Sequence, residues 1–120
     1  MSYKNTTSLS QRESESSRIL AKYPNVIPVI IESRSKDLIL KKNKFLVPYD
    51  VSSSHLLYAI RKQLKLDESK AIFMFYDDVL ISGTQMMSEI YEKYKEKNLI
   101  GKKIHDKFFY INISVENTFG

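Results

Sequence analysis

Apolar residues concentrate in four stretches of the chain, and their spacing predicts strands. Val26–Glu32 (VIPVIIE) is β-branched and almost entirely apolar, as expected for a strand covered on both faces. Lys44–Pro48 (KFLVP) is short, flanked by lysines and closed by a proline, which is typical of an edge strand. Lys70–Tyr76 (KAIFMFY) and Phe108–Ser114 (FFYINIS) predict two more strands. We expect the first two strands to pair antiparallel and the first and last to pair in parallel at the sheet centre.

Three other stretches predict helices. Ser10–Lys22 begins with a candidate N-cap, Ser10, and carries Glu13 three residues later, which is the spacing of a capping box. The range His55–Lys65 has a stripe of leucine and isoleucine at helical spacing, and Gln85–Lys95 has a face of methionine, isoleucine and tyrosine. Helices and strands alternate in an order that predicts an α+β fold, with a mixed sheet covered by helices.

The remaining segments predict the domain boundaries. Residues 1–9 are polar and aperiodic, so we expect a flexible N-terminal segment before a single domain over residues 10–114. Lys95–Lys107 is charged and contains a glycine, which predicts an extended basic loop. Residues 115–120 are expected to form a flexible tail.

Composition narrows the class of protein. The chain has 120 residues, enough for one domain with one hydrophobic core. It contains no cysteine, which excludes disulfides, thiolate metal ligands and cysteine nucleophiles. No apolar run has membrane-spanning length, and the N-terminus lacks the apolar segment of a signal peptide. A membrane role would therefore require a lipid or a partner.

The positive charge is concentrated in one region. The net charge is +5, and residues 34–65 contain eight Lys/Arg and two Asp, so this region carries +6 and the remainder −1. Such a region is either a solvated face or a landing surface for acidic partners. No zinc spacing, arginine cluster or aromatic ribonucleoprotein motif is present, so no nucleic-acid partner is expected.

The sequence lacks the motifs of catalysis. There is no Ser/His/Asp set, and the phosphate-binding patterns GxGxxG and GxxxxGK[ST] are absent. The two histidines, His55 and His105, lie in unrelated contexts, and His55 has no second ligand at metal spacing. We therefore expect no enzyme activity, no metal and no cofactor, and any chemistry to be done to this chain by others.

Five segments between Arg12 and Gly120 carry a family signature. In order along the chain they are KYPNVIPVIIE, KNKFLVPYDVS, HLLYAIRKQL, AIFMFYDD and FFYINISVENTFG. Together they resemble the GABARAP and light-chain-three family of autophagy ubiquitin-like modifiers. The resemblance implies a ubiquitin-like β-grasp fold with an additional N-terminal helical segment.

The resemblance also implies a conjugation reaction at the C-terminus. In such proteins an ATP-dependent activating enzyme adenylates the terminal glycine, and carrier enzymes transfer it to phosphatidylethanolamine. The glycine here would be Gly120, after the aromatic Phe119. Either the natural chain ends there or a protease trims residues beyond it, as happens in many relatives. The protein would be cytoplasmic when free and bound to the autophagosomal membrane when lipidated.

The family further binds cargo receptors through aromatic-x-x-aliphatic motifs, which add as a strand beside the second strand. Carried over to this sequence, the aromatic pocket would use Ile19, Pro28, Ile30, Lys44, Leu46 and Phe108. The aliphatic pocket would use Phe45, Val47, Pro48, Val51, Leu56 and Ala59. The backbone of Lys44 and Leu46 would supply hydrogen bonds, and Lys42, Lys44 and Arg61 would meet acidic residues of the motif.

Alternatives remain open from the residues alone. Val47, Leu56 and Ala59 fit core positions as well as pocket positions, and Lys42 also fits a charge that protects an edge strand. Ala59 is smaller than the usual residue of the family, and the segment before Ser10 is short. The alternative functions are a ubiquitin-like peptide-binding module without conjugation, and a modifier joined to protein lysines.

Overall fold

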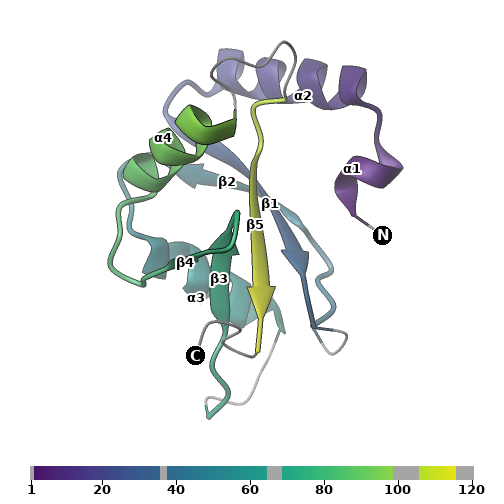
Figure 1. Ribbon diagram of the computed structural model, residues 1–120. Coiled ribbons are helices and arrows are strands. Elements are labelled where there is room, and N and C mark those ends of the chain that lie inside the picture. The colour runs from purple at the N-terminus through teal and green to yellow at the C-terminus, as the bar shows by residue number, and fades with distance from the viewer. Residues whose placement is uncertain (1, 36–37, 65–68, 99–105, 116–120) are drawn as a thin grey trace.

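Within the residues that the structure describes, the fold has nine elements and one sheet. The computed structural model describes residues 2–35, 38–64, 69–98 and 106–115. The elements are α1 (Tyr3–Thr6), α2 (Leu9–Lys22), β1 (Val26–Ser33), β2 (Lys44–Pro48), α3 (Ser53–Leu64), β3 (Phe73–Tyr76), β4 (Val79–Ile81), α4 (Met87–Asn98) and β5 (Phe109–Ser114). The strands form one mixed sheet in the order β2-β1-β5-β3-β4, which makes β2 and β4 its edges (Figure 1).

The centre of the sheet is the parallel pair of β1 and β5. Val29 of β1 is aligned with Phe109 of β5, and β2 pairs antiparallel with the other side of β1. Five consecutive residues of β1, Ile27–Ile31, are buried, because helices cover both faces of the sheet. The predicted central pair and the predicted edge strand are both confirmed.

Pro28 lies in β1, where a residue without an amide hydrogen is unusual. The Ile31 amide donates to the Asn43 carbonyl (2.7 Å) and the Tyr49 amide donates to the Asn25 carbonyl (2.9 Å). Because hydrogen-bonded pairs alternate in an antiparallel ladder, these bonds place Pro28 and its partner Leu46 in a non-hydrogen-bonded pair. Pairing with β5 starts only at Val29, so the ladder needs no amide from Pro28.

The sheet separates two groups of helices. In Figure 1, α1 and α2 lie at the top and right, and α3 and α4 lie at the left. On the α4 face, Phe109 packs against Tyr91 and Tyr94, with ring centroids 5.6 and 4.7 Å apart. On the opposite face, the Tyr3 ring of α1 meets Phe108 edge-on at 5.7 Å. The core is thus a two-sided one, with α3 contributing the buried Leu56 and Ile60.

The N-terminal region differs from the prediction in two ways. We expected no regular element in residues 1–9, and the structure has α1 there, with Ser2 as its N-cap. The helix α2 is capped by Ser8 rather than Ser10, and Ser8 forms the capping box with Gln11. The Ser8–Gln11 pair has the same spacing as the predicted pair, so the local sequence fitted both starts.

One strand and several boundaries also differ from the prediction. Strand β4 was not predicted, because it has only three residues and two of them are exposed. It forms a hairpin with β3 through Asp77 and Asp78, whose φ angles of 47° and 64° suit a tight turn. Strand β3 begins at Phe73 rather than Lys70, and α4 continues to Asn98 into the predicted loop 95–107. Residues 99–105 of that loop lie outside the described residues.

The helices of this fold are short. Within the part of the chain that the structure describes, no helix has the length and apolar character needed to cross a bilayer.

Candidate peptide-docking site

The edge strand β2 presents unpaired main-chain groups. Lys44 and Leu46 both belong to non-hydrogen-bonded pairs with β1. Their amide and carbonyl groups therefore point away from β1. Since β2 is at the edge of the sheet, these groups face outward. An extended peptide can pair with such an edge as an added strand.

Side chains of β2 alternate between the two faces of the sheet, and this alternation divides the predicted residues into two groups. Ile30 is aligned with Lys44 of β2 and with Tyr110 of β5, whose ring lies 4.3 Å from the Lys4 ammonium of α1. The predicted aromatic-pocket residues of the sheet therefore lie on the α1/α2 face, where Ile19 of α2 is also half-buried. Leu46 is the most open member, at 45% exposure.

The predicted aliphatic-pocket residues lie mainly on the other face. Phe45 and Val47 are aligned with Val29 and Ile27 of β1, so they point to the side of the sheet that α3 and α4 cover. Phe45 is half-buried, whereas Val47 belongs to the core together with Leu56 of α3. A strand added to β2 could therefore direct alternate side chains to two different subsites, one on each face of the sheet.

Burial limits which predicted residues a peptide can touch. Six of the fourteen are half-buried or exposed on β2 or next to it, namely Lys42, Lys44, Phe45, Leu46, Pro48 and Val51. Five are buried, namely Pro28, Ile30, Val47, Leu56 and Phe108. The five buried residues have little surface that a peptide could contact. The roles of all fourteen residues in binding remain predictions.

Lys44 is held in place by two residues that the sequence did not single out. Its ammonium forms an ion pair with Glu15 of α2 and lies 5.3 Å from the Tyr3 ring and 5.8 Å from the Phe108 ring. The Tyr3 hydroxyl also donates to Glu15, at 2.9 Å. Burial tends to lower the pKa of Lys44, but the interactions with Glu15 and Tyr3 together outweigh it and raise that pKa. The hydrogen bond from Lys44 lowers the pKa of Glu15, so both groups are charged at neutral pH.

A buried ion pair fixes the two N-terminal helices on this face. Arg12 of α2 donates from Nε to Asp106 (2.9 Å) and from Nη1 to the carbonyls of Lys4 (3.1 Å) and Thr7 (2.5 Å). Asp106 also accepts hydrogen bonds from the Phe108 amide and the Tyr110 hydroxyl. The buried residues of α2 are Arg12 and Ser16, which are both polar, so this helix is held by hydrogen bonds as well as by apolar contact. The only signal in the sequence for the Arg12–Asp106 contact was an arginine on a helix without an apolar stripe.

The other predicted charges have local partners. The Lys42 ammonium lies 5.9 Å from the Phe45 ring, and Arg61 donates to the Lys70 carbonyl (2.8 Å). Gly120, the predicted conjugation site, lies outside the described residues. Among the residues that are described, no three His, Cys, Asp or Glu side chains are grouped so that they could hold a metal ion.

Comparisons with known proteins agree on one family. The family model described as "Autophagy protein Atg8 ubiquitin like" matches residues 11–120. "Autophagy-related protein 8" of Schizosaccharomyces pombe is 43% identical over 98% of this chain and 93% of its own length. The protein of the same name from Mycosarcoma maydis is 42% identical over 98% of this chain and 95% of its own length.

Solved structures show the same fold. Trypanosoma brucei ATG8 superimposes with a TM-score of 0.82 at 29% identity, covering 100% of this chain and 98% of that one. Plasmodium falciparum Atg8, in complex with a Plasmodium falciparum Atg3 peptide, has a TM-score of 0.80 at 28% identity and covers 98% of both chains. This chain, with a mixed sheet, an open β2 edge and added N-terminal helices, belongs to the Atg8 family of ubiquitin-like autophagy proteins.

Proposed function

We propose that this protein is a membrane-conjugated adaptor of autophagy rather than an enzyme. It would be joined through Gly120 to phosphatidylethanolamine and would recruit cargo receptors through β2. Family membership supports the general assignment, and the Plasmodium Atg8 relative was solved with an Atg3 peptide, which fits a conjugation-enzyme partner. In its free form the protein would be cytoplasmic, and after lipidation it would reside on autophagosomal membranes.

The observation that carries the docking proposal is the geometry of β2. Its outward main-chain groups can bind the backbone of an extended peptide. An aromatic side chain of that peptide would pack on the α1/α2 face beside Leu46, and an aliphatic side chain would pack on the other face beside Phe45. These two residues are neighbours on the strand and point to opposite faces, so a single added strand can reach both subsites.

Acidic residues in the partner would compete for Lys44. The ion pair of Lys44 with Glu15 is partly exposed, with 32% and 26% of the two side chains accessible. Partly exposed pairs contribute little to stability, so an incoming carboxylate can share the ammonium or replace Glu15. Because this attraction is electrostatic, peptide affinity should fall as the salt concentration rises.

The docking proposal is tested by titrating a peptide such as Asp-Glu-Trp-Glu-Glu-Leu against variants of β2. We expect Leu46→Ala and Lys44→Glu each to weaken binding by about tenfold, since both remove a central contact. Leu80→Ala is the matched control, because Leu80 is similarly exposed (41%) on the opposite edge strand. Unchanged affinity in both β2 variants, measured by calorimetry, would rule out this strand as the docking edge.

The conjugation proposal is tested with purified activating and carrier enzymes, ATP and phosphatidylethanolamine liposomes, followed by intact-mass analysis. The expected product is the chain plus one lipid, and Gly120→Ala should give none while its circular dichroism stays unchanged. An adduct to protein lysines instead of lipid would favour the second modifier class. If active enzymes formed no adduct, the protein would be a peptide-binding module without conjugation.

A further inference from the structure

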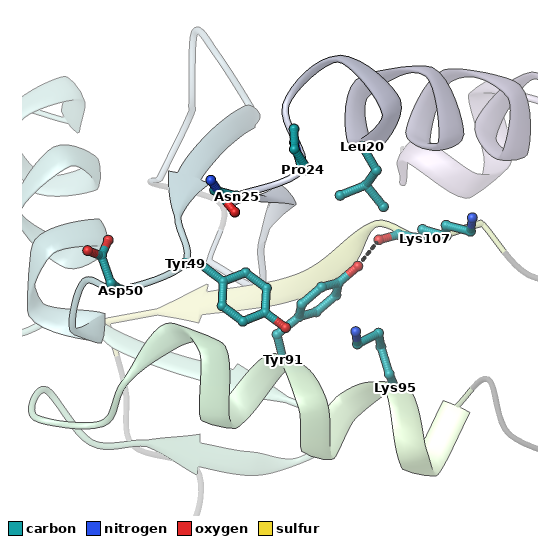
Figure 2. Close-up of a pocket in the computed structure, with 8 residues that line it drawn as sticks. All are labelled: Leu20, Pro24, Asn25, Tyr49, Asp50, Tyr91, Lys95 and Lys107. Atoms are coloured by element: carbon teal, nitrogen blue, oxygen red, sulfur yellow. Dashed lines mark hydrogen bonds between the residues drawn. The ribbon is translucent and has the colours of Figure 1, made fainter.

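A cavity lies outside the set of residues predicted to bind the peptide motif. It has a volume of about 760 Å³ and opens between the end of α2, the β2–α3 connection and α4 (Figure 2). We call it the α2–α4 cleft; its lining residues are Leu20, Pro24, Asn25, Tyr49, Asp50, Tyr91, Lys95 and Lys107. None of these residues belongs to the predicted motif-binding set. The volume is in the range of cavities that hold small ligands or peptide side chains.

The floor of the α2–α4 cleft is aromatic and held in position. Tyr91 is buried, and its ring stacks on Phe109 at a centroid distance of 5.6 Å. Its hydroxyl donates to the Lys107 carbonyl at 2.7 Å, and Tyr49 meets it edge-on at 6.4 Å. The Tyr49 hydroxyl is in turn bound to Glu92. A preformed floor lowers the entropic cost of binding a flat apolar side chain.

The wall opposite the tyrosines is apolar. Figure 2 shows the Leu20 side chain extending from α2 toward the tyrosines, with Pro24 beyond it at the start of the connection to β1. Leu20 is half-buried and Pro24 is exposed. An aromatic side chain between this wall and the two tyrosine rings would bury apolar surface on both of its faces.

Positive charge lies at one end of the cleft. The Lys95 ammonium is 4.5 Å from the Tyr91 ring and 2.8 Å from Glu92, in a pair whose side chains are 31% and 52% exposed. For the Lys107 ammonium, no carboxylate partner is found among the described residues. A carboxylate next to the aromatic anchor would therefore meet the Lys95 ammonium, which is shared only with a weak surface pair. The Lys107 side chain extends away from the tyrosines (Figure 2), so its ammonium adds positive charge at the rim of the cleft.

We propose that the α2–α4 cleft binds an acidic peptide segment through one aromatic side chain, independently of the β2 edge. The aromatic ring lies between Leu20 and the tyrosines, a neighbouring carboxylate contacts Lys95, and Lys107 adds longer-range attraction from the rim of the cleft. The lining does not include the first turn of any helix, which is where compact phosphate groups are usually held. The net positive charge of the chain, +5, also favours acidic partners.

The test is a titration of the ¹⁵N-labelled protein with the peptide acetyl-Glu-Glu-Trp-Glu-Glu-amide, followed by amide chemical shifts. We expect saturable shifts in the cleft, at Asn25, Asp50 and Lys95, with a dissociation constant of about a millimolar or tighter. The peptide with alanine in place of tryptophan should give no saturable shifts there, because it lacks the anchor.

Two variants separate specific binding from general charge attraction. The double variant Lys95→Glu/Lys107→Glu should weaken binding by about tenfold, whereas Lys93→Glu, an exposed site on the same helix, should change it by less than about twofold. The Lys107 carbonyl accepts a hydrogen bond from Tyr91 and its amide donates to the Ser16 hydroxyl, so substitution of the side chain leaves both bonds in place.

Three results would overturn the proposal. The first is an absence of shifts in the cleft, or shifts confined to β2. The second is equal affinity of the double variant and the original chain. The third is a response of the same amides to adenosine monophosphate but not to the peptide, which would make the cleft a nucleotide site. The β2 proposal stands or falls separately, because Leu46→Ala leaves the cleft unchanged.

Discussion

Removing the guanidinium of Arg12 should be among the most destabilising single changes at the N-terminal helices. The ion pair of Arg12 and Asp106 is buried, with side-chain exposures of 11% and 4%. Deleting one member of a buried pair typically costs about 3–5 kcal/mol, because the other charge stays buried without its partner. Asp106 keeps two donors, the Phe108 amide and the Tyr110 hydroxyl, so we expect the lower end of that range, about 3 kcal/mol, for Arg12→Ala.

The measurement is equilibrium unfolding in urea followed by circular dichroism. With an m-value of about 1.5 kcal/mol/M, a loss of about 3 kcal/mol lowers the unfolding midpoint by about 2 M. The unfolding midpoint of the conservative variant Arg12→Lys should fall between those of the original chain and Arg12→Ala. One ammonium cannot reach Asp106 and the carbonyls of Lys4 and Thr7 together. Arg18→Ala, an exposed arginine of the same helix, should stay within about 0.5 kcal/mol.

The reasoning is refuted if Arg12→Ala lowers the midpoint by less than about 0.5 M with an unchanged m-value. That result would mean that water replaces the guanidinium around Asp106 at little cost. A double-mutant cycle with Asp106→Asn checks the cause, since direct contact predicts a coupling of at least about 1 kcal/mol.

Two more predictions concern the core and the tyrosines. Ile60→Ala, at a fully buried position of α3, should lower the free energy of unfolding in urea by about 2–5 kcal/mol. Tyr58→Ala, on the exposed side of the same helix, should lower it by less than about 0.5 kcal/mol. Equal effects of the two variants would contradict the assigned helix face. Burial and the hydrogen bond to Glu92 raise the pKa of Tyr49 to about 12. Burial raises the pKa of Tyr91, Tyr94 and Tyr110 further. The stability that these tyrosines contribute to the fold is complete below about pH 10, the pKa of tyrosine in the unfolded chain. It is lost as the pH rises through their higher pKa values in the folded protein. Tyrosinate absorbance at about pH 11 should therefore be well below that of the unfolded chain, and equal absorbance in a folded sample would contradict it.

Local pattern was sufficient for most of the sheet. The apolar run of β1 and the lysine-flanked, proline-ended β2 were recognisable because strand position in a sheet determines which residues are tolerated. Five segments between Arg12 and Gly120 were also enough to suggest the family, and the comparisons with known proteins confirm it. Strand β4 was missed because three residues with two exposed apolar side chains carry no period.

The N-terminal helices show what local pattern could not provide. Helix α1 has four residues and no buried side chain, so its sequence has no reason to be helical by itself. It is held by residues outside the helix: Glu32 of β1 accepts the Tyr3 amide, and Arg12 of α2 binds the carbonyls of Lys4 and Thr7. The same holds for the Lys44–Glu15 pair, whose members are 29 residues apart in sequence.

The sequence by itself therefore determined the class of fold, the central and edge strands, and the resemblance that leads to the family. These follow from periodicity and composition, which are properties of neighbouring residues. Only the tertiary structure decided which face of the sheet each β2 side chain occupies, what orients Lys44, and that a cleft with a tyrosine floor lies beside α4. Those features depend on register and on contacts between distant segments, and the free energy of such contacts exists only once the chain has folded.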